Sequence, residues 1–365
     1  MDVGIPVEQS PNEFRVGLTP QGVRLVTQEG HRCYVERGAG LHAGFQDTDY
    51  QRAGGTIVYS AAEVYGRADV VLKVGAPTPP ELGLVRDGQA ILAFWHLAAQ
   101  PREVVQTLVD KRITAIAYEM IQTDDGRLPV LQPLSQIAGR MAPQIAARWL
   151  QNDGGGVGLL IGGVIGIPPI DVLVIGAGEV GLSAAHLFQA NGARVFLMDQ
   201  DLDRLRAAQQ GCNGSIVTMV SYDFNIERVL KFAHVVVGAV LIPGQRTPLL
   251  VPREMVRAMR PRSIVIDISI DQGGCFETSR PTTLANPVFV EENVIHFCVP
   301  NLTSAVARTA THAYLNGAWP YGQLIPRLGV EEAIRGNAAL MRGVAVHNGE
   351  ILHEGIVHPA PAAGR

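Results

Sequence analysis

The sequence predicts an α/β protein with two domains, one of which is a doubly wound parallel sheet. Short apolar runs such as residues 172–175 and 264–268 are too short for helices and are typical of strands buried on both faces. Segments with helical periodicity follow several of these runs, which is the order of a parallel sheet with helices on its faces. With 365 residues, the chain is long enough for two or three domains.

The clearest unit is a strand, a helix and a second strand within residues 170–200. Three glycines with the spacing G-x-G-x-x-G lie at the turn into the helix, and these are Gly176, Gly178 and Gly181. Glycine allows a tight turn and a close approach to phosphates at a helix N-terminus, so the unit predicts a Rossmann-like domain that binds a dinucleotide. Glycines alone also serve ordinary turns, but the flanking strand and helix favour the nucleotide site. Asp199 ends the second strand and would bind the ribose hydroxyls; because its charge repels a 2′-phosphate, NAD is predicted rather than NADP.

Further strand-like runs lie on both sides of this unit. Before it they occur at 3–6, 33–36, 70–74, 90–95 and 113–118, with an amphipathic helix at 20–29. After it they occur at 235–240, 264–268 and 294–299. Because the N-terminal set has no glycine fingerprint, we expect it to form a second α/β layer, the candidate substrate domain.

The order of these segments predicts that the NAD-binding domain is inserted into a discontinuous substrate domain. A helix at 135–149 would connect the two domains, and the residues from 305 onward are again helix-permissive and are expected to pack on the first domain. The prediction is therefore a substrate domain of residues 1–128 plus 305–365 and an NAD-binding Rossmann domain of residues 129–304. The last residues, 355–365, are proline- and alanine-rich and are expected to be loosely ordered.

The composition argues against several kinds of partner. A hydrophobic content of 47% with 18% charged residues is typical of a well-packed enzyme, and a net charge of −4 without basic runs does not favour nucleic acid. The apolar segment 154–169 is broken by glycines and prolines, so no membrane span is expected. The four cysteines have no C-x-x-C spacing, which predicts neither a metal site nor a disulfide framework. No signal pattern is found at the start, so we expect a cytoplasmic protein with a small-molecule substrate.

Two acidic residues and one histidine are candidates for chemistry. Asp267 and Asp271 lie where a buried strand turns into a glycine-rich loop, and ligands of open α/β sheets bind at the carboxyl ends of strands. Either residue could instead be a turn or helix cap, and Asp271 is preferred as the functional one. His96 follows the run 90–95, and an imidazole can give or take the proton that accompanies hydride transfer to C=O or C=N. A purely structural His96 is the alternative.

Two cationic residues are candidates for substrate binding. Arg15 could hold a substrate carboxylate through a bidentate fork, or could form a surface salt bridge with Glu13 or Glu8. Lys73 lies within a buried run, where a charged amine is unfavourable unless it faces a cleft or an acid.

The motifs that contain these residues resemble the alanine dehydrogenase family, which shares its fold with the NAD-binding part of proton-translocating transhydrogenase. The resemblance lies in VGIPVEQSPNEFRVGLTP, FWHLAA, YEMIQTDDGRLPVLQPLSQIAGRMAPQ, VIGAGEVG, VVGAVLIPG and DISIDQGGCFETSRPTT. The motifs occur in the family's order and spacing up to about residue 325. The resemblance implies an NAD-dependent oxidoreductase that acts on an amino acid and its 2-oxo acid.

The resemblance also implies roles for individual residues. Arg15 would hold the substrate carboxylate, His96 would be the acid or base, and Asp271 would assist at the reacting carbon. Asn301 would lie near the nicotinamide and, with Lys73, complete the predicted substrate-binding set. The residues implied in binding NAD are Ser135, Gly176, Gly178, Gly181, Asp199 and Ser221. The family further implies a homo-oligomer, a hexamer or a dimer.

The chain departs from the family pattern at two places. Where the family has a second lysine and a glutamate after VLKV, this chain has Gly75 and Ala76. The missing lysine is the one that contacts the substrate and polarises its carbonyl or imine. The family's small apolar segment with a Met-Pro pair is Leu302-Thr303-Ser304 here. We therefore predict a substrate other than alanine, such as a larger amino acid or a related C=N compound; the alternatives are genuine L-alanine dehydrogenase and an NAD-bound sensor or non-redox enzyme.

Overall fold

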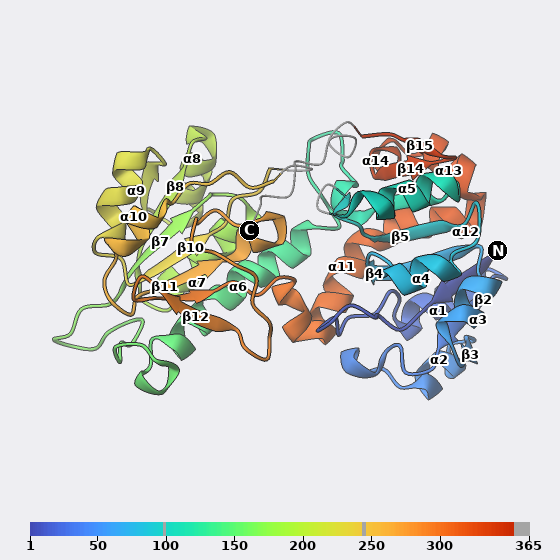
Figure 1. Ribbon diagram of the computed structural model, residues 1–365, viewed down its shortest axis with the longest axis horizontal. Helices are drawn as coiled ribbons and strands as arrows, with labels where there is room; N and C mark the ends of the chain where they lie inside the picture. Colours follow the sequence, from blue (N-terminus) through green and yellow to red (C-terminus); the bar gives the residue numbers. More distant parts are fainter. Residues whose placement is uncertain (98–99, 243–245, 354–365) are drawn as a thin grey trace. The chain divides into compact units, whose positions relative to one another are not determined.

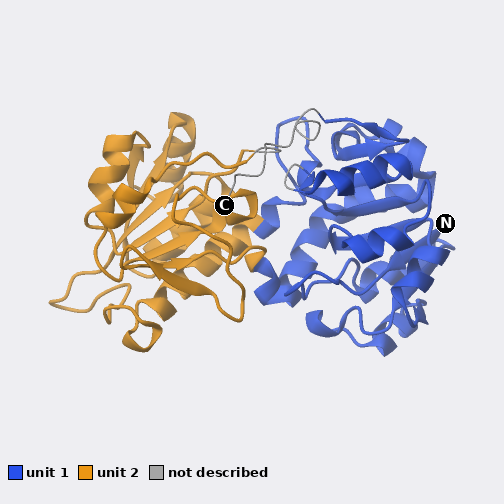
Figure 2. Ribbon diagram, in the orientation of Figure 1, with its two compact units in different colours: residues 1–134, 243–245, 303–365 blue, residues 135–242, 246–302 orange. Residues whose placement is uncertain are grey.

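The computed structural model describes residues 1–97, 100–242 and 246–353. They form two compact units (Figure 2): the described part of unit 1 lies within Met1–Leu134 and Thr303–Arg365, and unit 2 comprises Ser135–Ile242 and Arg246–Leu302. Each unit contains one mainly parallel sheet with helices around it (Figure 1), so the predicted α/β fold with two Rossmann-like domains is confirmed. The segment 355–365, predicted to be loose, lies outside the described residues.

The sheet of unit 1 has eight strands in the order β15-β14-β6-β5-β4-β1-β2-β3. The parallel strands are β1 (Asp2–Ile5), β2 (Arg32–Glu36), β3 (Thr56–Val58), β4 (Val70–Gly75), β5 (Ala90–Phe94) and β6 (Thr114–Ala117). The strand order changes direction between β1 and β4, and the carboxyl ends of such a strand pair are the usual ligand site of an open α/β sheet.

Nine α-helices are described in unit 1. They are α1 (Pro20–Gln28), α2 (Asp47–Arg52), α3 (Ala61–Arg67), α4 (Pro79–Leu84), α5 (Arg102–Asp110), α11 (Ala307–Gly322), α12 (Leu324–Leu328), α13 (Val330–Gly336) and α14 (Ala338–Arg342). The predicted amphipathic helix at 20–29 is α1. Thr19 caps it, Pro20 takes its first position, and Val23 and Val26 are buried on its inner face.

The C-terminal part of the chain contributes both a helix and strands to unit 1. The hydroxyl of Tyr314 on α11 donates to the carbonyl of Val16 at 2.6 Å. β14 (Val344–His347) pairs antiparallel with β6, with Val344 opposite Ile116, and β15 (Glu350–Ile351) pairs with β14. The N-terminal and C-terminal parts of the chain therefore contribute strands to the same sheet. The sequence analysis does not predict β14 and β15.

The sheet of unit 2 has seven strands in the order β12-β13-β11-β10-β7-β8-β9. They are β7 (Asp171–Ile175), β8 (Arg194–Asp199), β9 (Val217–Val220), β10 (Val235–Gly238), β11 (Ile264–Asp267), β12 (Val288–Glu291) and β13 (Val294–Phe297). All are parallel except the edge strand β12, which pairs antiparallel with β13. The strand order changes direction between β7 and β10. In doubly wound sheets, ligands usually bind at the carboxyl ends of the two strands where this change occurs.

The helices of unit 2 begin with the long helix that the sequence predicts at 135–149. They are α6 (Gln132–Trp149), α7 (Glu179–Ala190), α8 (Leu202–Gly211), α9 (Asp223–Leu230) and α10 (Arg253–Arg257). The buried faces of β7 and β10 are apolar throughout, which explains their unbroken hydrophobic runs. In the described residues, no helix is long and apolar enough to cross a membrane.

Candidate active site

The glycine turn after β7 has the geometry that a dinucleotide requires. Gly176 has φ +104°, and a Cβ there would lie 2.4 Å from the carbonyl oxygen of Ala239; a Cβ on Gly181 would lie 1.8 Å from the carbonyl oxygen of Gly176. By contrast, a Cβ on Gly178 would meet no heavy atom of the described residues within 4 Å. Two glycines are therefore required by packing, and the third leaves open space at the N-terminus of α7, where backbone N–H groups can bind a pyrophosphate.

Asp199 lies beside this turn at the end of β8. Its carboxylate accepts the backbone N–H of Ala177 at 2.7 Å and that of Asp201 at 2.9 Å. Each carboxylate oxygen has more than one lone pair, so these contacts orient the side chain and leave acceptor capacity for a ribose hydroxyl. Ser221, after β9, donates its backbone N–H to the carbonyl of Asp199 at 3.1 Å. The predicted ribose-binding residues thus lie at one edge of the sheet.

Ser135 lies on α6, the helix that packs on the N-terminus of α7. The neighbouring Gln136 donates to Glu179 of α7 at 3.1 Å. The two helices are so close at Gly139 that a Cβ there would lie 2.2 Å from the carbonyl oxygen of Val180. Ser135 is half-buried at this end of the glycine turn.

The loop after β11 carries Asp271 and is tied to the loops around it. This loop forms a short 3-10 turn, Ile268–Gln272, and the backbone N–H of Val240 after β10 donates to the hydroxyl of Ser269 at 2.9 Å. Asp271 is exposed, and its carboxylate accepts the backbone N–H of Asn301 at 2.7 Å. Asn301 has φ +53°, a left-handed conformation that asparagine tolerates better than most residues. Unit 2 therefore brings the predicted Asp271 and Asn301 together.

Asp267 occupies a very different environment from Asp271. It is 1% exposed and accepts the backbone N–H groups of Ser269 and Cys275 and the hydroxyl of Ser279, at 3.1, 3.0 and 2.7 Å. Burial raises the pKa of Asp267 to about 6, although these hydrogen bonds oppose the rise. Asp267 thus stabilises the turn from within, while Asp271 faces outward.

Arg15 is buried in unit 1 rather than paired on the surface. Its Nε and Nη2 donate to the carboxylate of Glu13 at 2.8 and 2.6 Å, and Nη1 donates to the hydroxyl of Thr303 at 3.1 Å. Burial lowers the pKa of Arg15, but the adjacent Glu13 more than offsets this, so the net pKa is raised. Next to it, Ser304 accepts the backbone N–H of Phe14 at 2.8 Å. The segment Leu302-Thr303-Ser304, which differs from the family pattern, therefore contributes two hydroxyl groups that contact Phe14 and Arg15.

Lys73 is fully buried on β4 between two carboxylates. Its Nζ lies 2.7 Å from Oε1 of Glu81 on α4 and 3.1 Å from Oε2 of Glu8 in the loop after β1. Their side chains are 0%, 3% and 2% exposed, respectively. Burial lowers the pKa of Lys73, but the two carboxylates outweigh this and raise it, so the amine is charged. The sequence predicts that this buried lysine faces a cleft or an acidic residue, and in the structure it faces two acidic residues.

Gly75, at the end of β4, lies where the family has a lysine, and a Cβ would fit there without a clash. Its φ lies outside the left-handed region, so any residue can adopt this conformation. A Cβ there would lie 3.6 Å from Oγ of Ser10 and 3.7 Å from Oε2 of Glu8, which are ordinary van der Waals distances. The backbone N–H groups of Val74 and Gly75 donate to Glu8 at 2.6 and 3.3 Å, where the pairing of β4 with β5 is irregular.

His96 follows β5 in a left-handed conformation, with φ +44°. Its backbone N–H donates to Oε1 of Glu119 at 2.6 Å, and that of Trp95 donates to Oε2 of the same carboxylate at 3.2 Å. His96 is half-buried, and its ring stacks on that of Phe94 with centroids 6.3 Å apart. Left-handed backbone in a non-glycine residue is uncommon and is found more often at functional sites.

The residues of unit 1 therefore gather at the carboxyl ends of four adjacent strands. Glu8 follows β1, Gly75 ends β4, His96 follows β5 and Glu119 follows β6. Glu8, Glu81 and Glu119 were missed as functional candidates, because a single glutamate after a strand forms no pattern of its own. Their place in the family-like motifs around residues 3–20 and 118–144 was the available signal for Glu8 and Glu119.

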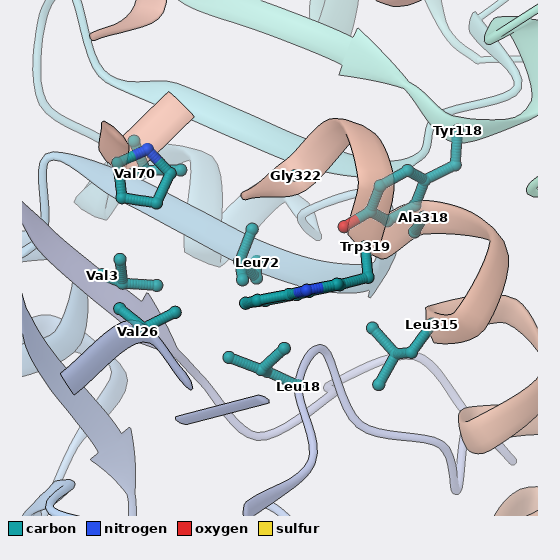
Figure 3. Close-up of a pocket in the computed structure, with 11 residues that line it drawn as sticks. Val3, Leu18, Val26, Val70, Leu72, Tyr118, Leu315, Ala318, Trp319 and Gly322 are labelled. Carbon is teal, nitrogen blue, oxygen red and sulfur yellow. The ribbon is translucent and has the colours of Figure 1, made fainter. Parts of the chain in front are cut away.

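A separate apolar cavity lies deeper in unit 1 and is not part of this arrangement. It has a volume of about 20 Å³, enough for about one water molecule. Figure 3 shows the indole ring of Trp319 extending between Leu72 and Leu18. The cavity is a packing defect rather than a substrate site. Within residues 1–97, 100–242 and 246–353, no group of three or more His, Cys, Asp or Glu side chains is arranged to hold a metal ion.

These two units define a class: a pyridine-nucleotide-dependent oxidoreductase. One unit has a dinucleotide turn, and the other has Arg15 in the loop between β1 and α1 and His96 after β5. The chain belongs to the alanine dehydrogenase/PNT family, because the family model for the N-terminal domain matches residues 4–138 and that for the C-terminal domain matches residues 142–354. It is accordingly an NAD-dependent oxidoreductase of the amino-acid dehydrogenase type, and NAD is its cofactor.

Relatives support this assignment over the whole chain. An alanine dehydrogenase of Mycobacterium tuberculosis (strain CDC 1551 / Oshkosh) is 43% identical over 354 residues, 97% of this chain and 95% of that protein. An alanine dehydrogenase of Methanococcus maripaludis is 41% identical over 357 residues, 98% of this chain and 95% of that protein. A solved structure of an L-alanine dehydrogenase superposes with a TM-score of 0.92 at 38% identity, covering 98% of this chain and 99% of the other.

Proposed function

We propose that this chain is an NAD-dependent amino-acid dehydrogenase whose main substrate is not alanine. In the oxidative direction, the amino acid, NAD⁺ and water would give the 2-oxo acid, NADH, ammonium and a proton. The hydride leaves the α carbon, and the C=N bond that forms is then hydrolysed. When bound, NAD supplies the acceptor for this hydride.

Within this proposal, the residues of unit 1 bind the substrate and move its proton. Arg15 binds the substrate carboxylate, since Glu13 and Thr303 orient its planar guanidinium, which matches a carboxylate. His96 exchanges the proton at the substrate nitrogen or oxygen. Lys73 is assigned a positioning role: its Nζ pairs with Glu8 and Glu81, so it acts on the site through Glu8.

The residues of unit 2 would hold the cofactor. The glycine turn, Ser135, Asp199 and Ser221 bind the dinucleotide, and Asp271 and Asn301, which contact each other, lie on the nicotinamide side. The separation into a substrate domain of residues 1–128 plus 305–365 and an NAD-binding domain of residues 129–304 belongs to the same proposal. So do a homo-oligomeric state and a cytoplasmic location.

The observation that carries the choice of substrate is Gly75 itself, which has no side chain where the family has a lysine. The family's lysine there polarises the carbonyl or imine. A charge-assisted hydrogen bond of this kind is worth about 1.5–3 kcal/mol, and more where it strengthens in the transition state. Its absence predicts roughly ten- to several-hundred-fold less activity on pyruvate or alanine. Lys73 does not compensate in this proposal, because two carboxylates already bind its Nζ.

Genuine L-alanine dehydrogenase is the second candidate, and the relatives at 41–43% identity that bear this name favour it. An NAD-bound sensor or non-redox enzyme is the third. Retention of Arg15, His96 and Asp271 argues against a pure binding module.

The test is steady-state NADH oxidation with ammonium and a panel of 2-oxo acids, pyruvate first. Native protein is compared with Gly75→Lys, and Gly75→Ala is the control for loss of the glycine alone. We expect poor turnover of pyruvate by the native protein and restoration by Gly75→Lys but not by Gly75→Ala. High native turnover of pyruvate that the lysine does not improve would support ordinary alanine dehydrogenase. No change in nicotinamide absorbance with any oxo or amino acid would support the non-redox alternative.

A further inference from the structure

The nearest neighbours of a side chain at residue 75 would be hydrogen-bonding groups rather than apolar side chains. The two groups nearest to a Cβ at this position are the hydroxyl of Ser10 and Oε2 of Glu8, at 3.6 and 3.7 Å. No third heavy atom of the described residues outside the chain neighbours lies within 4 Å. Gly75 itself is half-buried at the end of β4, where substrates of this fold bind. A group at this position therefore meets a carboxylate and a hydroxyl.

The carboxylate at this position belongs to a group with excess negative charge. Lys73 forms ion pairs with both Glu8 and Glu81, and these three charged groups together carry one net negative charge. All three side chains are almost completely buried, and an uncompensated buried charge is strongly unfavourable. Burial raises the pKa of Glu8, and the ammonium of Lys73 offsets this rise only in part.

The chain differs from the family at residues 75 and 76, and these two residues have different neighbours on opposite sides of the end of β4. Gly75 faces Glu8 and Ser10, whereas Ala76 packs against the apolar cluster that includes Tyr65 and Leu82. Loss of the family's glutamate at residue 76 therefore does not remove negative charge from the face that carries Glu8. Loss of the lysine at residue 75 removes a cation from that face.

We propose that the substrate itself supplies this cation: the space at Gly75 is the subsite for the terminal ammonium group of a diamino monocarboxylic acid, which Glu8 and Ser10 bind. This inference rests on the proposed amino-acid dehydrogenase function and names its substrate class. Arg15 binds the α carboxylate, the α amine is the reacting group, and the second amine pairs with Glu8. A cation here balances the charge of Glu8, Lys73 and Glu81, as the family's lysine would.

The test compares pairs of amino acids that differ only in an ammonium against a methyl group. L-2,4-Diaminobutyrate is paired with L-norvaline, and L-ornithine with L-norleucine, at saturating NAD with NADH formation as the readout. We expect the cationic member of at least one pair to have a kcat/KM about ten- to a hundredfold higher, the range of a charge-assisted hydrogen bond. Glu8→Gln should abolish this ratio, because it should lower kcat/KM for the cationic member much more than for the apolar member.

Glu81→Gln is the matched control, because it also removes a carboxylate from Lys73 but does not face Gly75. It should keep the ratio. If Glu8→Gln does not fold, Gly75→Lys tests the same point, since it places a cation in the subsite and should invert the preference. Turnover of alanine, norvaline or norleucine without preference for the diamino acids would overturn the inference and leave the dehydrogenase function intact. Absence of NADH formation with every amino acid, in a protein that binds NAD, would overturn both.

Discussion

The backbone N–H of His96 donates to Oε1 of Glu119 at 2.6 Å, so a buried strand end and a carboxylate together hold the proposed acid/base residue in a left-handed conformation. Glu119 does not contact the imidazole through this bond. It therefore acts on His96 through the backbone, as a positioning residue.

Glu119→Ala should lower kcat about ten- to a hundredfold, with a smaller change in KM, because the imidazole loses its orientation but the substrate groups remain. Glu119→Gln keeps one carbonyl acceptor and should recover part of the activity. Steady-state kinetics of the three proteins provide the measurement. Equal losses of kcat and stability in both variants would instead indicate a general folding role.

His96→Asn should separate the chemistry from the fold. Asparagine tolerates a positive φ, so the free energy of unfolding should change by less than about 1 kcal/mol. Without the imidazole, kcat should fall about 10²- to 10⁴-fold, the range of general acid–base catalysis. Denaturant unfolding and turnover, measured on the same preparation, check both expectations; retention of kcat would remove His96 from the mechanism.

Two glycines of the fingerprint should respond differently to alanine. Gly181→Ala places a Cβ 1.8 Å from the carbonyl oxygen of Gly176, so it should destabilise unit 2 and abolish NAD binding together. Gly178→Ala meets open space in the protein, so it should leave thermal unfolding almost unchanged and weaken NAD binding alone. Thermal unfolding without NAD and titration with NAD separate the two effects. Equal destabilisation by both variants would contradict this interpretation of the turn.

Lys73→Met should be among the most destabilising single changes in unit 1. It leaves Glu8 and Glu81 buried without their cation, which typically costs about 3–5 kcal/mol. Because burial already raises the pKa of Glu8, protonation favours the fold, and the loss should be smaller at low pH and larger as the pH rises above the pKa of Glu8 in the fold. Urea unfolding of native and variant proteins across this range tests the sign.

Asp267 should make the stability of unit 2 depend on pH. Its pKa rises from 3.8 to about 6 in the fold, which corresponds to about 3 kcal/mol. The contribution is fully present below pH 3.8 and is lost as the pH rises through about 6. Asp267→Asn should make the free energy of unfolding depend less on pH between about 3.8 and 6. It should also lower stability, because its amide group cannot accept all three hydrogen bonds. An unchanged pH profile would assign the dependence to other groups.

Much of this architecture is predictable because its central strands are buried on both faces. The runs that become β4, β5, β7, β10, β11 and β13 read as strands without further information, although several end slightly earlier than expected, at Phe94, Gly238, Asp267 and Phe297. The edge strands β3, β9 and β15 are short and partly exposed, so their sequences lack that signal. β14 is apolar, but its partner β6 is remote in sequence, and no local pattern indicates the pairing.

The residues of the candidate site also divide into those that a local sequence pattern predicts and those that it does not. The glycine spacing and Asp199 are local patterns. The preference for Asp271 over Asp267 as the functional residue stays a prediction; in the structure Asp271 is exposed and Asp267 is buried. The pairing of Lys73 with Glu8 and Glu81 is not readable from the sequence, because it joins β4 to a loop after β1 and to the first turn of α4. Only the three-dimensional arrangement identifies these partners.

The pairing of β14 with β6 also has a consequence for biosynthesis. Unit 2 is formed from one nearly uninterrupted stretch, and all of its strands precede α11 and β14 in the chain. Unit 1 cannot complete its sheet until Val344 reaches Ile116, and until then β6 is an exposed edge that invites intermolecular pairing. During translation, we therefore expect the nucleotide-binding unit to reach its native form before unit 1, although much of unit 1 is synthesised earlier.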